Sequence, residues 1–302
     1  MKQQAFLLVA ATFSGLGIAQ QTELRGPVTG FIYERTTRSL RPVLGVLGAA
    51  HLGEAVLSGV EAAAVSPNGR IALAVADQEL IRLDLSTGER TGISAGIAGD
   101  RIIWNKASSA ALIAETGTGR LSLWEPSDGL TSLADVPGAI TAAAVSDSGD
   151  VAVASAGGIY AVTRAGGPRL IAPVEELGGL AVQASDLFFA DRGASAIFRV
   201  RDFAASASVE KVSDAPAGAT GLGLSRDGEI LFVASSESRS VRAMRLATGE
   251  IAGEIPLDFT PSAVEPLSAS AYLLNPGATG PLQVLDARAQ AAVYFVPAAE
   301  VN

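Results

Sequence analysis

Polar side chains that could bind a cation or a ligand recur at one position of a regular sequence pattern. Each directly follows a short apolar run, such as residues 71–76 or 230–234, that is typical of a buried strand. Strand ends adjoin the loops of a fold, where binding residues concentrate. Six positions share the pattern, and all six are polar: Asp77, Glu115, Ser155, Asp191, Ser235 and Asn275.

Two kinds of chemistry fit these six residues. Carboxylate oxygens are ligands of hard cations, so Asp77, Glu115 and Asp191 would be the ligands of a Ca²⁺ ion if the chain binds one. Alternatively, each side chain accepts backbone N–H bonds from the turn that follows and caps it. The repetition favours capping, because a structural role recurs in every repeat whereas a catalytic role breaks the symmetry. We therefore assign no catalytic residue and no cofactor, with Ca²⁺ as the alternative.

The loops after these strand ends differ from one another, and we expect a ligand to be recognised there. Their sequences range from the short Gln78-Glu79 to the glycine-rich residues 276–280. The charged candidates that they contribute to a ligand-binding face are Glu79, Arg120, Arg192 and Arg239.

Several other enzyme chemistries lack the residues that they need. The chain has no cysteine, which excludes disulfides, thiolate metal sites and a cysteine nucleophile. His51 is the only histidine, so a Ser-His-Asp triad would have to use it, and a histidine-rich zinc site is excluded. The glycines at 117–119 and 166–167 indicate turns. Neither pair opens a helical pattern, so a phosphate-binding loop is not supported.

The balance of charge argues against nucleic acid as a partner. The formal net charge is −9 and the isoelectric point is near 4.8. Binding to phosphates requires clustered lysine and arginine, whereas this chain has 31 acidic against 22 basic residues. An anionic membrane surface is unfavourable for the same reason.

Residues 1–19 have the features of a signal peptide. Lys2 supplies the positive start, residues 5–19 are apolar, and Gly17 and Ala19 place small residues before a cut at Gln20. The apolar run is shorter than a membrane-spanning helix requires, although a short N-terminal anchor is the alternative. We expect a periplasmic or secreted protein that does not insert into the membrane after cleavage.

The chain repeats itself with a period near 40 residues. Similar turns end at Gly69, Gly149 and Gly228, which are 80 and 79 residues apart, and the units between them match in pattern. Six units result over residues 61–297, starting near residues 61, 99, 139, 177, 216 and 256.

Each unit predicts a four-stranded antiparallel sheet. Two apolar runs flank the first turn, an alternating strand such as residues 80–85 follows, and a weaker strand ends the unit. Apolar inner strands and half-polar outer strands are what the blades of a β-propeller need. We therefore predict an all-β fold in which residues 20–302 form a single propeller domain.

The number of blades depends on residues 27–60. Residues 29–34 and 40–46 resemble the third and fourth strands of a blade, with Glu34 placed like Asp84, Glu125 and Asp286. The chain's C-terminal end also offers such a hairpin, so the two ends do not complete one blade between them. Either residues 27–60 form a reduced seventh blade, or six blades close and the hairpin docks outside. The length of the mature chain favours seven.

Two units resemble known propeller repeats. Residues 224–249 are similar to the YVTN-type repeats of bacterial exported propellers, and residues 186–200 resemble an NHL repeat. The resemblance implies a bacterial, exported propeller of the superfamily that contains lactonase-like enzymes. It implies no single activity, because binding scaffolds, hydrolases and lyases share these repeats.

We expect a non-catalytic binding or scaffold propeller for a protein, a peptide or a glycan, acting as a monomer. The alternative is a metal-assisted hydrolase or lyase of the lactonase-like type, with a cation held by the three strand-end carboxylates.

Overall fold

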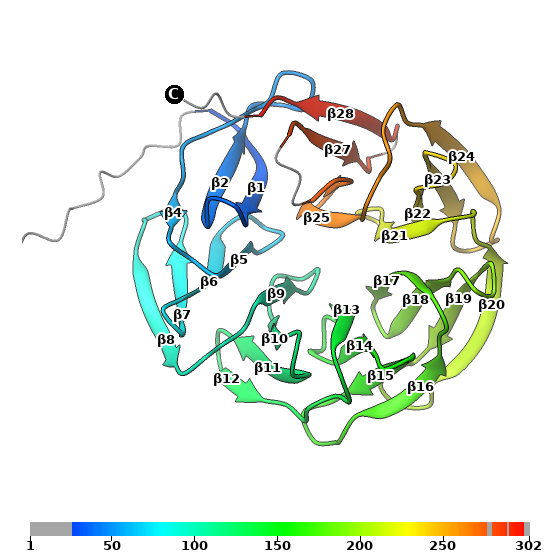
Figure 1. The fold of residues 1–302 in the computed structure, drawn as a ribbon, viewed down its shortest axis with the longest axis horizontal. Helices are drawn as coiled ribbons and strands as arrows, with labels where there is room; N and C mark the ends of the chain where they lie inside the picture. The colour runs from blue at the N-terminus through cyan, green and yellow to red at the C-terminus, as the bar shows by residue number, and fades with distance from the viewer. Residues whose placement is uncertain (1–25, 277–279, 289, 299–302) are drawn as a thin grey trace, which may run out of the picture.

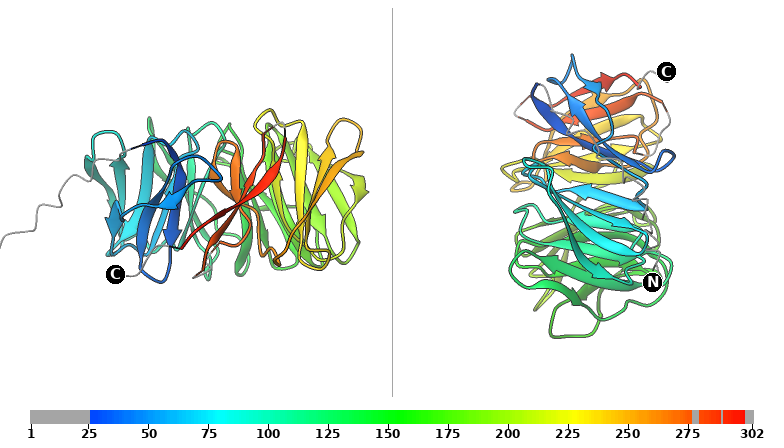
Figure 2. Two further views of the ribbon diagram at one scale, coloured as in Figure 1. Left: turned by 90° about the horizontal axis from the view of Figure 1, so that it is seen from above. Right: turned by 90° about the vertical axis from the view of Figure 1, so that its left-hand side faces the viewer.

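The computed structural model describes residues 26–276, 280–288 and 290–298 and contains strands and turns throughout them. Its 28 strands form seven antiparallel sheets around a central axis (Figure 1). From the side the ring is a flat disc whose thickness the strands cross (Figure 2). The predicted all-β propeller with seven blades is confirmed. No helix of the described residues is long and apolar enough to cross a membrane. The predicted signal peptide lies outside these residues.

Six blades each contain four strands that follow one another along the chain, from the axis to the rim. Blade 2 contains β5 (Ala62–Val65), β6 (Ile71–Ala76), β7 (Glu79–Asp84) and β8 (Arg90–Ala95), and blade 3 contains β9 (Arg101–Trp104), β10 (Ala111–Glu115), β11 (Arg120–Glu125) and β12 (Gly129–Ser132). Blade 4 contains β13 (Ile140–Val145), β14 (Val151–Ser155), β15 (Gly158–Val162) and β16 (Arg169–Pro173), and blade 5 contains β17 (Leu177–Gln183), β18 (Asp186–Asp191), β19 (Ala196–Arg201) and β20 (Ser208–Asp214). Blade 6 contains β21 (Ala219–Leu224), β22 (Ile230–Ser235), β23 (Ser240–Arg245) and β24 (Ile251–Pro256), and blade 7 contains β25 (Glu265–Ser268), β26 (Ala271–Leu273), β27 (Leu282–Asp286) and β28 (Ala292–Val296).

The hydrophobic core lies between neighbouring blades. Leu112 and Leu121 of blade 3, for example, pack against Val151 and Val153 of blade 4, and all four are fully buried. At some points near the axis, neighbouring first strands approach so closely that only a glycine fits, as at Gly179 and Gly221. A Cβ atom on Gly221 of β21 would lie 2.4 Å from a backbone nitrogen of blade 7. This explains why alanine and glycine are frequent in the first strands.

The two faces of the disc differ in the turns that they carry. We call the upper face the one with the turns between second and third strands and the links between blades. The lower face carries the turns between first and second strands, such as residues 66–70, and those between third and fourth strands.

Blade 1 is built differently from the other six. It contains β1 (Val28–Glu34), β2 (Ser39–Leu44), β3 (His51–Leu52) and β4 (Leu57–Ser58), and both β3 and β4 pair with β2. β1 is nearest the axis and lies between β5 and β25. Residues 28–58 thus form the seventh blade, in which β3 and β4 both pair with the same strand, β2.

The prediction that residues 29–34 and 40–46 are the third and fourth strands of a blade is wrong. The turn between β1 and β2 lies on the upper face, because the Arg38 carbonyl accepts a hydrogen bond from the Val60 nitrogen just before β5 begins. Tyr33, at the end of β1, likewise donates to the carbonyls of Val60 and Glu61. β1 thus runs opposite to β5. It corresponds to a second strand, β2 to a third, and β3 with β4 to a fourth.

Candidate functional site

One backbone hydrogen bond recurs on the upper face of six blades. In each, the link to the next blade donates an N–H to the carbonyl of the last residue in the turn between the second and third strands. The pairs are Val60 to Arg38 (3.1 Å), Ile97 to Gln78 (2.9 Å), Val136 to Gly119 (3.0 Å), Val174 to Gly157 (3.0 Å), Ala215 to Ser195 (3.0 Å) and Leu257 to Arg239 (2.8 Å). We call this contact the upper latch.

All six acceptor residues of the upper latch have positive φ. The angle is 50° at Arg38 and 47° at Arg239, where a side chain makes this conformation unfavourable, and 76° at Gly157. The latch therefore fixes the turns in a conformation that the backbone would otherwise avoid. Its presence after β1 confirms that β1 is the counterpart of a second strand.

Four of the six predicted strand-end residues form hydrogen bonds with backbone groups near the end of their strand. The Asp191 carboxylate accepts the Gly193 N–H at 3.0 Å, and the Ser235 hydroxyl accepts the Ser238 N–H at 3.0 Å. The Ser155 hydroxyl donates to the Ala139 carbonyl at 2.9 Å. Asn275 accepts the Gln283 N–H and donates to the Pro281 carbonyl. Asp191 and Ser235 thus accept an N–H from the turn that follows, as the capping interpretation expects, whereas Ser155 donates to the link before its blade and Asn275 bonds to the far end of its loop.

The other two strand-end residues are arranged differently. Glu115 accepts hydrogen bonds from the Thr118 hydroxyl at 3.1 Å and from the Arg120 guanidinium at 3.0 Å. Asp77 is exposed and forms a two-residue turn with Gln78, both at positive φ. Within the described ranges, no three histidine, cysteine, aspartate or glutamate side chains are grouped so that they could hold a metal ion.

Sequence reasoning missed one member of this set. Glu34 ends β1 as Glu115 ends β10, and its carboxylate accepts the Thr37 hydroxyl at 2.9 Å, as Glu115 accepts that of Thr118. The shared spacing of a glutamate and a threonine three residues later could have revealed the match.

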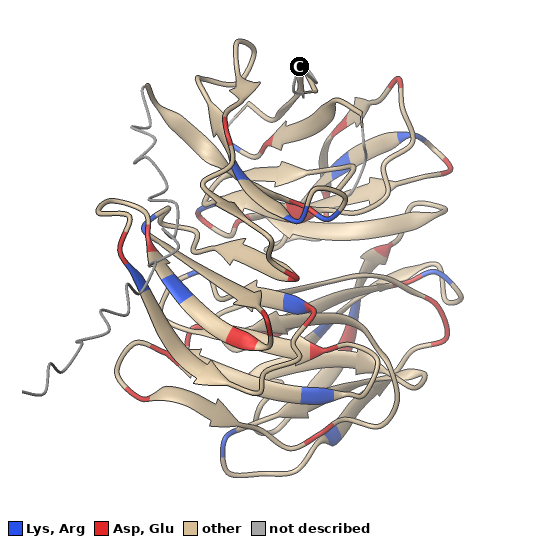
Figure 3. Ribbon diagram, turned by 60° about the vertical axis from the view of Figure 1, so that its left-hand side comes forward, with Lys and Arg blue, Asp and Glu red and all other residues tan. Residues whose placement is uncertain are grey.

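The charged loop candidates lie on the upper face with different surroundings. Arg120 and Arg192 are exposed and form ion pairs with Glu115 (3.0 Å) and Glu176 (3.6 Å). Glu79 and Arg239 are also exposed. Acidic and basic residues lie interspersed over the strands and turns in Figure 3. His51 is exposed on β3, which pairs with β2 on the side away from β1.

Two long cationic side chains of blade 3 reach blades on the other side of the axis. The Arg101 guanidinium lies 3.3 Å from the Glu265 carboxylate of blade 7. On the lower face, the Lys106 ammonium group donates to the Ser225 carbonyl of blade 6 at 3.4 Å. The sequence gives no indication of these contacts, because 164 and 119 residues separate the partners.

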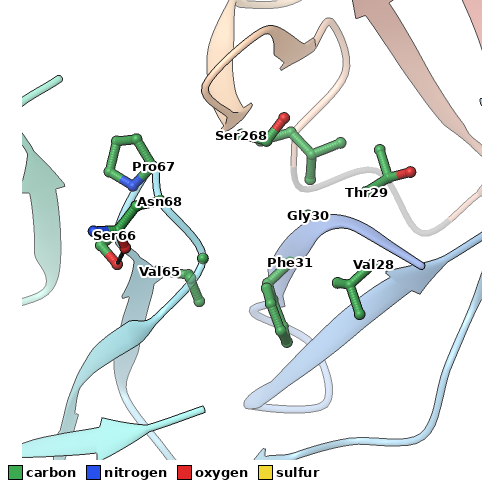
Figure 4. Close-up of a pocket in the computed structure, with 11 residues that line it drawn as sticks. Val28, Thr29, Gly30, Phe31, Val65, Ser66, Pro67, Asn68 and Ser268 are labelled. Atoms are coloured by element: carbon green, nitrogen blue, oxygen red, sulfur yellow. Dashed lines mark hydrogen bonds between the residues drawn. The ribbon is translucent and has the colours of Figure 1, made fainter. Parts of the chain in front are cut away.

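A cavity of about 240 Å³ lies toward the lower face, beside the start of β1. Its walls come from three blades, as Figure 4 shows. They are residues 28–31 of β1, residues 65–69 at the end of β5 and in its turn, and Leu267 and Ser268 of β25.

Comparison with known proteins supports the fold alone. No known family model and no curated protein matches the sequence. Virginiamycin B lyase from Staphylococcus aureus has a similar structure, with 14% identity and a TM-score of 0.55 over 80% of this chain and 84% of that chain. The Cps50 (Swd1) β-propeller domain of Myceliophteria thermophila matches with 12% identity and a TM-score of 0.59, over 80% and 87%. A functionally unknown protein from Desulfotomaculum acetoxidans matches with 10% identity and a TM-score of 0.60, over 89% and 99%.

These similarities are to propellers of different kinds, a lyase among them. At 10–14% identity they describe the arrangement of the blades and carry no residue of a site across. The chain is a seven-bladed, WD40-like propeller. The assignment of its repeats to the YVTN or NHL type stays a prediction.

Proposed function

We propose that this chain is an exported, non-catalytic binding or scaffold propeller that holds a protein, a peptide or a glycan on its upper face. The observation that carries the proposal is the upper latch. Six turns of the face have the same hydrogen bond to the next link, so their backbones are held in place before a ligand arrives. A preorganised surface of this kind lowers the entropic cost of binding.

The side chains on this rigid frame vary from blade to blade, which suits recognition. Blade 2 exposes Gln78, and blade 3 exposes Thr118 and Arg120. Blades 5 and 6 expose Arg192 and Arg239. By contrast, Asp191, Ser155 and Ser235 bond to the backbone of their own turns and links. The feature that repeats from blade to blade is thus the backbone hydrogen bond of the upper latch, whereas the exposed side chains differ between blades.

The test is a binding screen of the mature chain, residues 20–302, against glycan and peptide libraries. The charge reversals Arg192→Glu and Arg239→Glu change two exposed side chains of the upper face without removing a backbone bond. We expect these substitutions to raise the Kd of each ligand found by about tenfold or more, as changes at the centre of an interface do.

Arg70→Glu and Arg226→Glu are the matched controls, because both residues are exposed in lower-face turns. Ligands that bind equally well to all four variants would contradict an upper-face site. Conversion of a bound ligand into a product by the mature chain would contradict a non-catalytic role.

Export is tested separately. The proposal requires that the protein accumulate outside the cytoplasm, with Gln20 as the first residue of the mature chain. N-terminal sequencing of the protein from the extracytoplasmic fraction checks this. A chain that retains Lys2 in the cytoplasm would refute it.

A further inference from the structure

Asn68 differs chemically from the other two asparagines that the structure describes. It is followed by Gly69, whereas Asn105 is followed by a lysine and Asn275 by a proline. The Nδ2 atom of Asn105 donates to a serine hydroxyl at 2.9 Å, and that of Asn275 donates to a backbone carbonyl at 2.9 Å. Asn68 forms its side-chain hydrogen bonds through Oδ1, and its Nδ2 bonds to no other described residue.

The turn that contains Asn68 activates its side-chain carbonyl. Asn68 is exposed in the lower-face turn between β5 and β6. Its Oδ1 accepts the Ser66 hydroxyl at 2.8 Å and the Arg70 N–H at 3.0 Å, and Figure 4 shows Asn68 beside Ser66. Two donors on this oxygen stabilise the negative charge that develops there when a nucleophile attacks the carbonyl carbon, Cγ.

The backbone nitrogen of Gly69 is the nucleophile next to this carbon along the chain. Glycine has no side chain that obstructs its approach. In the folded turn the Gly69 N–H donates to the Ser66 carbonyl at 2.8 Å, so the turn must open before the nitrogen can reach Cγ. Exposed turns open locally at a small cost in free energy. The fold therefore slows an attack on Cγ without preventing it.

We propose that Asn68 is a site of spontaneous deamidation and that its turn directs the product to aspartate. The Gly69 nitrogen bonds to Cγ of Asn68, and Nδ2 leaves as ammonia with the proton of the Gly69 N–H, so that a succinimide ring remains. Water then adds to one of the two carbonyl carbons of the ring. Cleavage of the bond between Cγ and the Gly69 nitrogen gives aspartate. Cleavage of the bond between this nitrogen and the main-chain carbonyl carbon of residue 68 gives isoaspartate.

Blade 6 already contains an aspartate at the equivalent position. The Oδ1 atom of Asp227 accepts the Ser225 hydroxyl and, at 3.0 Å, the Glu229 N–H, which are the contacts that Asn68 has in blade 2. The hydrogen bond from Ser225 is the main reason why the pKa of the Asp227 carboxyl lies below its ordinary value. A carboxylate at residue 68 would thus be stabilised by donors that are already in place.

Isoaspartate fits the turn less well. It adds one carbon atom to the main chain between residues 68 and 69. The turn is closed by the hydrogen bond from the Gly69 N–H to the Ser66 carbonyl, and the Asn68 N–H ties it to the Ser108 hydroxyl of blade 3 at 3.0 Å. A longer main chain displaces the groups that form these bonds. The folded chain should therefore yield a larger share of aspartate than an unfolded chain.

The modification changes the charge of the cavity beside β1. Asn68 is one of its wall residues, so deamidation replaces a neutral amide by a carboxylate there. The change takes place on the lower face and leaves the side chains of the upper face as they are. It is therefore independent of the binding function proposed for the upper face.

The experiment follows the mature chain, residues 20–302, during incubation in mildly alkaline buffer made with water that contains heavy oxygen. Mass spectrometry of the tryptic peptide that ends at Arg70 measures the oxygen incorporated at residue 68, and chromatography separates its aspartyl and isoaspartyl forms. We expect Asn68 to react while Asn105 and Asn275 stay intact. The ratio of aspartate to isoaspartate should be several-fold higher than in the chain unfolded in urea.

Two variants test the role of the turn. Ser66→Ala removes the hydroxyl that donates to Asn68 and accepts the Ile71 N–H, so it should lower the share of aspartate toward that of the unfolded chain. Ser225→Ala is the matched control, because it makes the same change in blade 6 and should leave the products at residue 68 unchanged.

The variant Asn68→Asp reproduces the proposed product. It should resist urea at least as well as the parent, because a carboxylate forms stronger hydrogen bonds with the two donors than an amide does. A clear loss of stability in this variant would overturn the assignment of aspartate as the favoured product.

Three other results would overturn the proposal. The first is an Asn68 that stays intact in the folded chain over the time in which the unfolded chain is converted. The second is an equal share of aspartate in the folded and unfolded chains. The third is a reaction of Asn105 as fast as that of Asn68.

Discussion

Arg101 and Glu265 form an ion pair across the axis of the propeller, with 3.3 Å between a guanidinium nitrogen and a carboxylate oxygen. Arg101 begins β9 in blade 3, and Glu265 begins β25 in blade 7. No blade combines strands from both ends of the described chain, since β1 and β28 belong to different sheets. Contacts across the axis, together with the apolar packing of β1 against blade 7, therefore contribute to holding the ring closed.

The ion pair across the axis should contribute modestly to stability. The side chains of Arg101 and Glu265 are 32% and 43% exposed, so water and salt screen the attraction. We expect a coupling free energy of up to about 1 kcal/mol in a double-mutant cycle with Arg101→Ala and Glu265→Ala. Urea denaturation at low and high salt measures it, and the coupling should shrink at high salt. A coupling that salt leaves unchanged would contradict this account.

Two glycines of the upper latch should differ in their response to the same substitution. Gly157→Ala places a side chain at a φ of 76° but in free space, with the nearest neighbouring atom 4.0 Å away, and should cost about 1–2 kcal/mol. Gly119→Ala has the same backbone penalty, and its Cβ would also lie 2.3 Å from the Val136 carbonyl oxygen. The free energy of unfolding should therefore fall further in Gly119→Ala. If urea denaturation gave equal losses of unfolding free energy for the two variants, the backbone at Gly119 would be able to shift away from the Val136 carbonyl without cost.

The fold could be predicted from the sequence because the repeat is visible in it. Turns that end in Gly69, Gly149 and Gly228 mark the spacing of the units, and the apolar runs around them match the observed first and second strands. The assignment of strands in blade 1 failed because β1 (Val28–Glu34) carries polar residues where the other second strands have a continuous apolar run, so it resembles a third strand. What separates them is the upper latch, a backbone contact that no residue type encodes.

The candidate site was predicted in part. The positions of the strand-end residues follow from the strand pattern, and a side chain such as Asp191 has the turn contacts that a strand end offers. Contacts between distant blades could not be predicted from the sequence. The hydrogen bond from Lys106 to the Ser225 carbonyl, for example, forms only because the ring closes. The direction of β1 within blade 1 could not be predicted either, because the sequence does not specify it.

Tyr272 should make stability depend on pH above 10. Its hydroxyl donates to the Leu224 carbonyl and accepts the Leu224 N–H at 3.1 Å, joining blades 7 and 6, and burial raises the pKa of this phenol above 10. In the unfolded chain a tyrosine ionises near 10, so between the two pKa values only the unfolded state loses its proton. The free energy of unfolding is therefore unaffected below pH 10 and falls as the pH rises through the folded pKa.

The variant Tyr272→Phe tests this assignment. It should lose about 1–3 kcal/mol at neutral pH, because the Leu224 backbone groups lose their partner, and it should weaken the dependence on pH above 10. Tyr33→Phe is the control, since burial also raises the pKa of Tyr33 but its phenol is more accessible. A dependence on alkaline pH that is as steep in Tyr272→Phe as in the parent would contradict the assignment.

Calcium should leave the thermal stability of the mature chain unchanged. Glu115 already accepts hydrogen bonds from Thr118 and Arg120, and Asp191 accepts the Gly193 N–H, so a cation would have to compete with these contacts. A cation that binds the folded state alone would raise the Tm as its concentration exceeds the Kd. Differential scanning calorimetry with and without millimolar Ca²⁺ distinguishes the two cases. A rise in Tm that is lost in Asp191→Asn and retained in Asp84→Asn, a lower-face carboxylate, would favour the metal-assisted alternative over a binding scaffold.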